Sequence, residues 1–162
     1  ATGVVASHGD SAQYEVFLDK YHNPSTPQEE RRYQSALAAF PGEVEMERTL
    51  AMTLDGTIRT QDAPYLLAVA MRNKEHGHLA WEFIKDNWDQ VNKDFPSNSI
   101  VRMLSGVTSL SKPEQAADVI AFFDDHEVPQ GQLTLQQTLE KLWVNVALRE
   151  RESEPFSQSL TS

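Results

Sequence analysis

The chain has 162 residues, with 24 Asp and Glu against 14 Lys and Arg, a formal net charge of −10 and no cysteine. This length predicts one domain with a core of its own. The acidic balance argues against nucleic acid or an anionic membrane surface as a partner, the missing cysteines exclude disulfides and thiolate metal sites, and no apolar run approaches the roughly 20 residues of a membrane span.

Apolar residues recur at three- and four-residue steps, which is the pattern of amphipathic helices. In chain order the stripes are Tyr14, Phe17, Leu18 and Tyr21; Tyr33, Ala36, Leu37 and Phe40; Met46, Leu50 and Leu54; Trp81, Ile84, Trp88 and Val91; Ala116, Val119, Ile120 and Phe123; and Leu135, Leu139, Leu142 and Val146, which Trp143 widens. No stretch alternates with period two, so no sheet is predicted.

Capping residues and breakers divide these stripes. Helix starts are predicted at Thr26-Pro27-Gln28-Glu29, at Thr60 or Asp62 ahead of Pro64, at Ser111-Lys112-Pro113-Glu114 and at Thr134-Leu135-Gln136-Gln137. Turns are predicted at Asn23-Pro24-Ser25, Pro41-Gly42, Asp55-Gly56, Pro96-Ser97-Asn98 and Pro129-Gln130-Gly131. The fold class predicted is therefore all-α, an α-solenoid of about eight antiparallel helices in HEAT-like hairpins. From Arg149 onward the stripe is lost, and the tail is predicted to fray.

Two histidine motifs invite a metal interpretation, and spacing argues against both. His76 and His78 are two apart and would point to opposite sides of a helix, with no third ligand nearby. His126-Glu127 lacks the second histidine of a His-Glu-x-x-His helix, and Pro129 would break that helix. We therefore predict no metal site and no cofactor in this chain.

No other motif supports catalysis. Ser105-Gly106 and Ser109 lack the flanking glycines of a nucleophile elbow, and Asp124-Asp125 is expected to be a solvated helix end. No phosphate-binding glycine loop is present. The chain is predicted to hold no catalytic residues.

A distinctive combination of segments does indicate a family. It consists of TIRTQDAPY (57–65), Arg72-Asn73, LAWEFIKDNW (79–88), EERRYQSAL (29–37), Val107-Thr108-Ser109, Ala121-Phe122-Phe123 and QQTLE (136–140). Together these resemble the C-terminal helical domain of zinc metallopeptidases of the aminopeptidase N and puromycin-sensitive aminopeptidase type. The resemblance covers most of the chain from Ser7 to Arg151, and it implies residues 1–152 as part of such a helical domain, followed by a frayed tail at 153–162.

The resemblance implies a non-catalytic role beside a catalytic domain of the same polypeptide. That domain would carry zinc on His-Glu-x-x-His and would release N-terminal amino acids from peptides; neither this motif nor Gly-x-Met-Glu-Asn occurs here. The helical domain would close over the active site and shape peptide access. By the same resemblance, Arg72 could meet a peptide carboxylate or carbonyl; alternatively it serves only as a basic C-terminal cap.

Function, location and self-association have further expectations. The alternative function is a stand-alone α-solenoid that binds protein partners. A cytoplasmic location is favoured, with a secreted or periplasmic one left open. The segment from Gly3 to Gly9 is interpreted as the C-terminal end of a helix that starts upstream. Self-association is therefore predicted at the N-terminal end, where the apolar residues Val4, Val5, Tyr14, Phe17 and Leu18 would be left uncovered.

Overall fold

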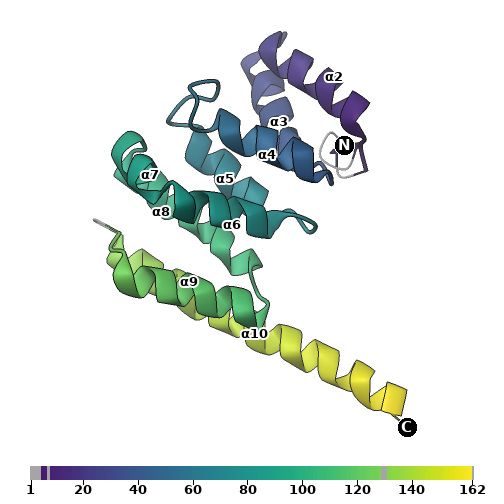
Figure 1. Ribbon diagram of the computed structural model, residues 1–162, viewed down its shortest axis with the longest axis vertical. Helices are drawn as coiled ribbons and strands as arrows, with labels where there is room; N and C mark the ends of the chain where they lie inside the picture. Colours follow the sequence, from purple (N-terminus) through teal and green to yellow (C-terminus); the bar gives the residue numbers. More distant parts are fainter. Residues whose placement is uncertain (1–4, 7, 129–130, 162) are drawn as a thin grey trace.

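The computed structural model describes residues 5–6, 8–128 and 131–161, with side chains described as far as Glu152 (Figure 1). The regular elements are α2 (Ser11–His22), α3 (Pro27–Leu37), α4 (Glu43–Met52), α5 (Ala63–Met71), α6 (Gly77–Asp86), α7 (Trp88–Asp94), α8 (Ser97–Leu104), the 3-10 helix η1 (Ser105–Ser109), α9 (Pro113–Asp125) and α10 (Gln132–Thr161). Every regular element in these ranges is a helix, which confirms the all-α prediction. Val4 and the Pro129–Gln130 turn lie outside the described residues.

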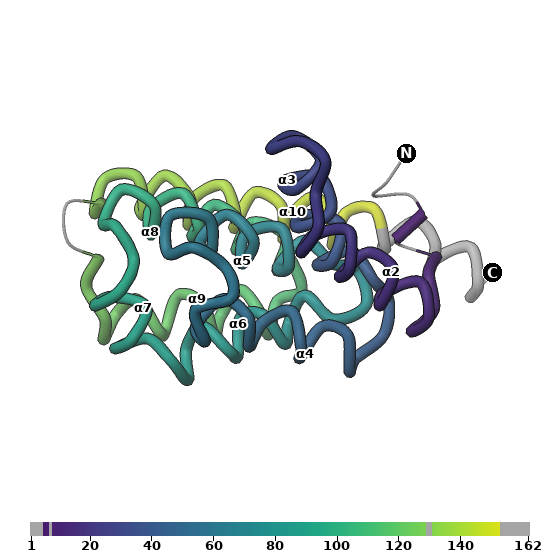
Figure 2. Tube along the Cα trace, turned by 90° about the horizontal axis from the view of Figure 1, so that it is seen from above, coloured from purple at the N-terminus to yellow at the C-terminus, as the bar shows by residue number. Residues whose placement is uncertain are grey.

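The helices stack in chain order in two rows (Figure 2). One row contains α5, α8 and α10, and the other contains α4, α6 and α9. Helix α5 packs on α6, α8 and η1, while α10 packs on η1, α8 and α9. This arrangement is solenoid-like; the HEAT-like pairing in hairpins remains a prediction. Within the described chain, no helix is both long and apolar enough to cross a bilayer.

At the N-terminal end, the apolar face of α2 is covered by the chain itself. Tyr14 and Phe17 are buried, and both rings meet Phe40 edge to face, with centroids 5.2 and 5.3 Å away. The predicted uncovered patch therefore does not form from Tyr14 and Phe17. Val5 is exposed, and Leu18 is only partly buried.

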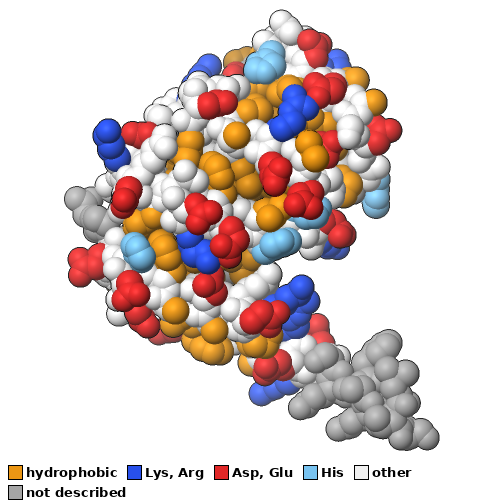
Figure 3. All heavy atoms as spheres, viewed as in Figure 1, with side chains coloured by type: hydrophobic (Ala, Val, Ile, Leu, Met, Phe, Trp, Pro, Cys, Tyr) orange, Lys and Arg blue, Asp and Glu red, His pale blue; other side chains and the backbone are white. Residues whose placement is uncertain are grey.

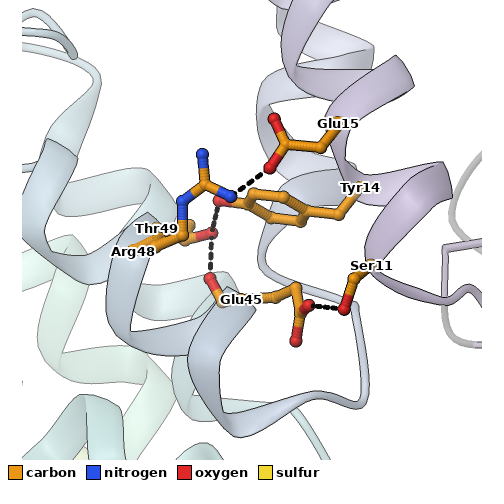
Figure 4. A network of polar contacts seen from close by, with 6 residues as sticks. All are labelled: Ser11, Tyr14, Glu15, Glu45, Arg48 and Thr49. Atoms are coloured by element: carbon orange, nitrogen blue, oxygen red, sulfur yellow. Dashed lines mark hydrogen bonds and ion pairs between the residues drawn. The ribbon is translucent and has the colours of Figure 1, made fainter.

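A polar network joins α2 to α4 beside these rings (Figure 4). Thr49 donates to the carbonyl of Glu45 at 2.8 Å, so the Tyr14 hydroxyl, 2.8 Å from Thr49 Oγ1, acts as the donor of the pair. The Ser11 hydroxyl donates to the Glu45 carboxylate. These bonds satisfy polar groups that burial would otherwise penalise.

The central stripe is buried as predicted, but it lies on two helices. Trp81, Ile84, Trp88 and Val91 are all buried. The predicted single helix is wrong because α6 ends at Asp86 and α7 begins at Trp88. Asn87 lies between them, and its side-chain amide donates to the carbonyl of Phe83 at 2.8 Å, which favours ending the helix there. The two indoles pack on Phe122 and Phe123 of α9.

Two apolar segments differ from the prediction. Helix α8 and η1 bury Ile100, Met103, Leu104 and Val107 in a region where no stripe was predicted. Trp143 was predicted to widen the buried stripe of α10, but its side chain is 53% exposed, whereas Leu135, Leu142 and Val146 are buried.

The predicted helix starts have mixed outcomes. Thr26 is confirmed as an N-cap, because its hydroxyl accepts from Glu29 N at 3.1 Å. Helix α9 is capped by Lys112 rather than Ser111, and α10 begins two residues before Thr134. Asp62 occupies the N-cap of α5 without a side-chain cap bond. The domain boundary predicted after residue 152 falls inside α10, and the frayed tail remains a prediction.

Candidate functional site

The site begins with Arg72, which ends the most buried helix of the stack. Helix α5 is apolar almost all round and buries seven of its nine residues, so its end is held firmly by the core. Arg72 is the C-cap, its backbone N–H donating to Val69 O at 3.0 Å, and its side chain is exposed. A cation is favourable at a helix C-terminus. Among the described residues the guanidinium has no hydrogen-bond or ion-pair partner, so it is free to meet a ligand.

Asn73 fixes the turn that presents Arg72. Its amide nitrogen donates to the carbonyls of Ala38 and Phe40, both at 2.9 Å, so the α5–α6 turn is tied to the segment after α3. Its amide oxygen accepts from the backbone N–H of Glu75 at 2.9 Å and of His76 at 3.1 Å. One side chain thus makes four hydrogen bonds. Sequence reasoning noted Asn73 only as part of a motif and missed this structural role.

Two glycines allow the close packing around this turn. A Cβ added to Gly77, at the start of α6, would lie 2.4 Å from the carbonyl oxygen of Met71. A Cβ added to Gly106, in η1, would lie 2.9 Å from the carbonyl oxygen of Ala68. Both distances are too short for a side chain, so the end of α5 is enclosed where only glycine fits.

Three hollows meet at Arg72. The first, about 320 Å³, lies between α5, α8 and α10 and is lined by Tyr65, Ala68, Val69, Arg72, Val101, Arg102, Ser105, Thr134 and Thr138. The second, about 430 Å³, lies between the α5–α6 turn, the start of α9 and α10. The third, about 500 Å³, lies between the end of α3 and the α5–α6 turn. Arg72 lines all three hollows. A peptide that crossed from one hollow to another would therefore pass it.

The second hollow, called here the basic hollow, is positively charged in an acidic molecule. Its Lys and Arg residues are Arg72, Lys74, Lys112 and Arg149, with His78 beside them and Glu75 as its acidic member. Arg149 is held in place by a hydrogen bond from Nη1 to Ser111 Oγ at 3.2 Å. Elsewhere acidic side chains are spread over the helices, as the face in Figure 3 shows. A local positive potential of this kind favours an anionic ligand such as a carboxylate.

The histidines do not form a metal centre among the described residues. His76 and His78 have ring centroids 6.2 Å apart, and no group of three His, Asp or Glu side chains in the described part of the chain converges as a metal ion requires. His126 stacks on Phe122 at 4.0 Å, and its Nδ1 lies 2.8 Å from the carbonyl oxygen of Phe122. The described histidines and their neighbours therefore do not fit a zinc ion.

The chain is similar to one family and to several aminopeptidases. The family model described as ERAP1-like C-terminal domain matches residues 1–142. Aminopeptidase M1-B of Oryza sativa is 30% identical over 83% of this chain and 15% of its own length. The alanine/arginine aminopeptidase of Saccharomyces cerevisiae is 31% identical over 91% of this chain and 18% of its length. Endoplasmic reticulum aminopeptidase 1 of Rattus norvegicus is 28% identical over 82% of this chain and 15% of its length. The chain thus spans less than a fifth of each of these relatives.

Proposed function

The chain belongs to the family of ERAP1-like C-terminal domains, and from this premise we propose that it is the non-catalytic C-terminal helical domain of a zinc aminopeptidase. The observation that carries the proposal is the family match over residues 1–142, together with relatives that are themselves aminopeptidases. The partner of this domain is the catalytic domain of the same polypeptide. That domain supplies the zinc, since the described residues here do not fit the metal.

The role proposed for the domain is to close over the active site and to limit which peptides reach it. An exposed arginine at the junction of three hollows supports contact with the peptide far from its N-terminus. We propose that Arg72 binds the peptide's terminal carboxylate, with Lys112 and Arg149 adding positive charge from the opposite side of the basic hollow. The C-terminal cap role of Arg72 is compatible with this, because it uses the same charge at the same helix end.

One experiment tests the whole assignment. The coding sequence upstream of Ala1 is expected to encode His-Glu-x-x-His several hundred residues earlier. A gene that lacks this motif would contradict the aminopeptidase assignment and favour the stand-alone scaffold.

A second experiment tests Arg72 in the full polypeptide. Peptides with a free or an amidated C-terminus are compared as substrates, and an aminoacyl-p-nitroanilide reports on the catalytic centre alone. Arg72→Ala should raise KM for the free-acid peptide about fivefold, as expected for the loss of one exposed ion pair, and leave the amidated peptide and the p-nitroanilide unchanged. Arg31→Ala removes another exposed arginine, on α3, and serves as the control. An equal rise in KM for acid and amide would exclude carboxylate binding by Arg72.

A further inference from the structure

The outward face of α10 is apolar and uncovered in the part of the chain that the structure describes. Leu135, Leu142 and Val146 turn inward and are buried, whereas Trp143 and Val144 are 53% and 57% exposed. Ala147 and Leu148 are exposed as well. These last four residues, Trp143, Val144, Ala147 and Leu148, are called here the outer stripe. Figure 1 shows that the C-terminal half of α10 extends beyond α9, and the outer stripe begins just before that half.

Opposite charges lie at the two ends of the outer stripe. Glu140 precedes it and Arg151 follows it, about three turns apart and within roughly 20° of each other around the helix axis. At one flank, Lys141 precedes the stripe and Glu152 follows it. All four side chains are exposed, and none has a hydrogen bond or ion pair within the described residues.

This order of charges is complementary to itself when the helix direction is reversed. Placing a two-fold axis between Asn145 and Val146, perpendicular to α10, puts Glu140 at the height of Arg151 in a second copy. The same operation brings Trp143 against Ala147 and Val144 against Leu148 of that copy, and Lys141 close to its Glu152. Because the symmetry repeats each contact, four ion pairs would flank one apolar seam.

We propose that α10 is a self-association surface, at which two copies of this chain pair antiparallel through the outer stripe. Self-complementary charge is the argument for a second copy over an unrelated partner, since an isologous interface requires one patch to match itself. The apolar contact covers only about three helical turns, so we expect the interface to be small and the dimer to be weak and reversible. The N-terminal end predicted from the sequence is not part of this surface.

The first test measures the mass of the 162-residue chain by sedimentation over a concentration series. The chain should pass from monomer to dimer, and Val144→Glu should raise the dissociation constant more than tenfold. Val16→Glu makes the same change at a valine of α2 that is 51% exposed, and it should leave the constant unaltered. Circular dichroism checks that both variants keep their helix content. A monomer at every concentration would overturn the proposal. The outer stripe would then be expected to contact another part of the parent polypeptide.

A charge exchange tests the antiparallel register. Glu140→Arg alone places like charges together twice in the dimer and should weaken it, as should Arg151→Glu alone. The double variant exchanges the two charges and should restore the dissociation constant to within about threefold of the original, because an exchanged ion pair has the same sign of energy. Failure of the double variant to recover would exclude this register.

A cross-linking test separates the antiparallel pair from a parallel one. The chain has no cysteine, so one introduced thiol is unique. In the antiparallel pair the two copies of position 144 lie about 5 Å apart along the axis and those of position 133 about 37 Å apart. A short bis-maleimide should therefore join Val144→Cys and leave Leu133→Cys as monomer. Equal cross-linking at both positions would contradict the proposal.

Discussion

The indole nitrogen of Trp81 on α6 donates a 2.7 Å hydrogen bond to Oδ2 of Asp118 on α9. The same oxygen accepts a hydrogen bond from Lys85 Nζ at 2.6 Å, and Lys85 also pairs with Glu82 at 3.0 Å. The Trp81 ring meets Phe122 edge to face at 5.3 Å. One carboxylate therefore fixes both the direction of a buried indole and the packing of α6 on α9.

Removing that carboxylate should destabilise the fold. Asp118→Ala leaves the Trp81 N–H without its acceptor in a buried setting, and we expect a loss of about 1–3 kcal/mol in the free energy of unfolding. Asp124→Ala, on the same helix, removes an exposed carboxylate with no partner among the described residues and should cost less than about 0.5 kcal/mol. Urea denaturation measures both. Equal stability of the two variants would show that the Trp81–Asp118 bond contributes nothing.

The Asp118 contribution should depend on pH. Burial raises the pKa of Asp118, but the hydrogen bonds from Lys85 and Trp81 outweigh burial and leave the pKa below its usual value of 3.8. A carboxyl whose pKa is lower in the folded state stabilises it fully above the unfolded pKa and loses that effect as the pH falls through the folded pKa. The stability difference between the native chain and Asp118→Ala should thus be constant above about pH 5 and shrink below about pH 4. A stability difference between the two proteins that grows as the pH falls would contradict a lowered pKa of Asp118.

The turn that presents Arg72 should depend on Asn73. Asn73→Asp keeps the acceptor for Glu75 and His76 N–H but replaces the donor to Ala38 and Phe40 with an anion facing two carbonyls. We expect a loss of about 2–3 kcal/mol and faster hydrogen exchange at the Glu75 and His76 amides. Asn92→Asp on α7 makes the same change at an exposed asparagine and is the control.

Helical periodicity predicted most of the core but not where helices end. Trp81 and Trp88 were correctly predicted to be buried, because three- and four-residue spacing identifies the inward face of a helix. The break at Asn87 depends on a local bond to Phe83 that competes with helix continuation, and hydrophobic spacing carries no information about it. For α8, the inward residues Ile100, Met103 and Leu104 cover too few turns to make a recognisable stripe.

The candidate site was predicted only in part. Arg72 was correctly placed at a helix end before a turn, because an Arg-Asn pair after an apolar run is a local signal. The basic hollow was missed because Lys112 and Arg149 lie far from Arg72 in the sequence and are brought together only by the stacking of the helices. The same limit applies to Asn73, whose partners Ala38 and Phe40 belong to an earlier segment.

Trp88 and Trp143 should differ in fluorescence and in their contribution to stability, because only Trp88 is buried. Trp88 is 5% exposed and packs on Phe122 and Phe123, so Trp88→Ala should cost about 3–5 kcal/mol and reduce the blue-shifted emission to that of the other buried indole, Trp81. Trp143 is half exposed, so Trp143→Ala should cost less than about 1 kcal/mol and remove red-shifted emission. The Trp143→Ala comparison is made on dilute protein, so that self-association does not affect it. A similar loss for both variants would mean that the Trp143 side chain is buried in solution.

The histidine pair should prove inert towards metal. His76 and His78 bring two imidazoles to one turn, but a zinc site with protein ligands needs at least three, and no described Asp, Glu or His completes the set. The isolated chain should therefore not hydrolyse aminoacyl-p-nitroanilides, with or without added zinc, and a chelator should leave its melting temperature unchanged. The double variant His76→Ala/His78→Ala should behave identically in both assays. Zinc-dependent turnover that survives purification and disappears in the double variant would place catalysis in this chain, and the proposed non-catalytic role would have to be abandoned.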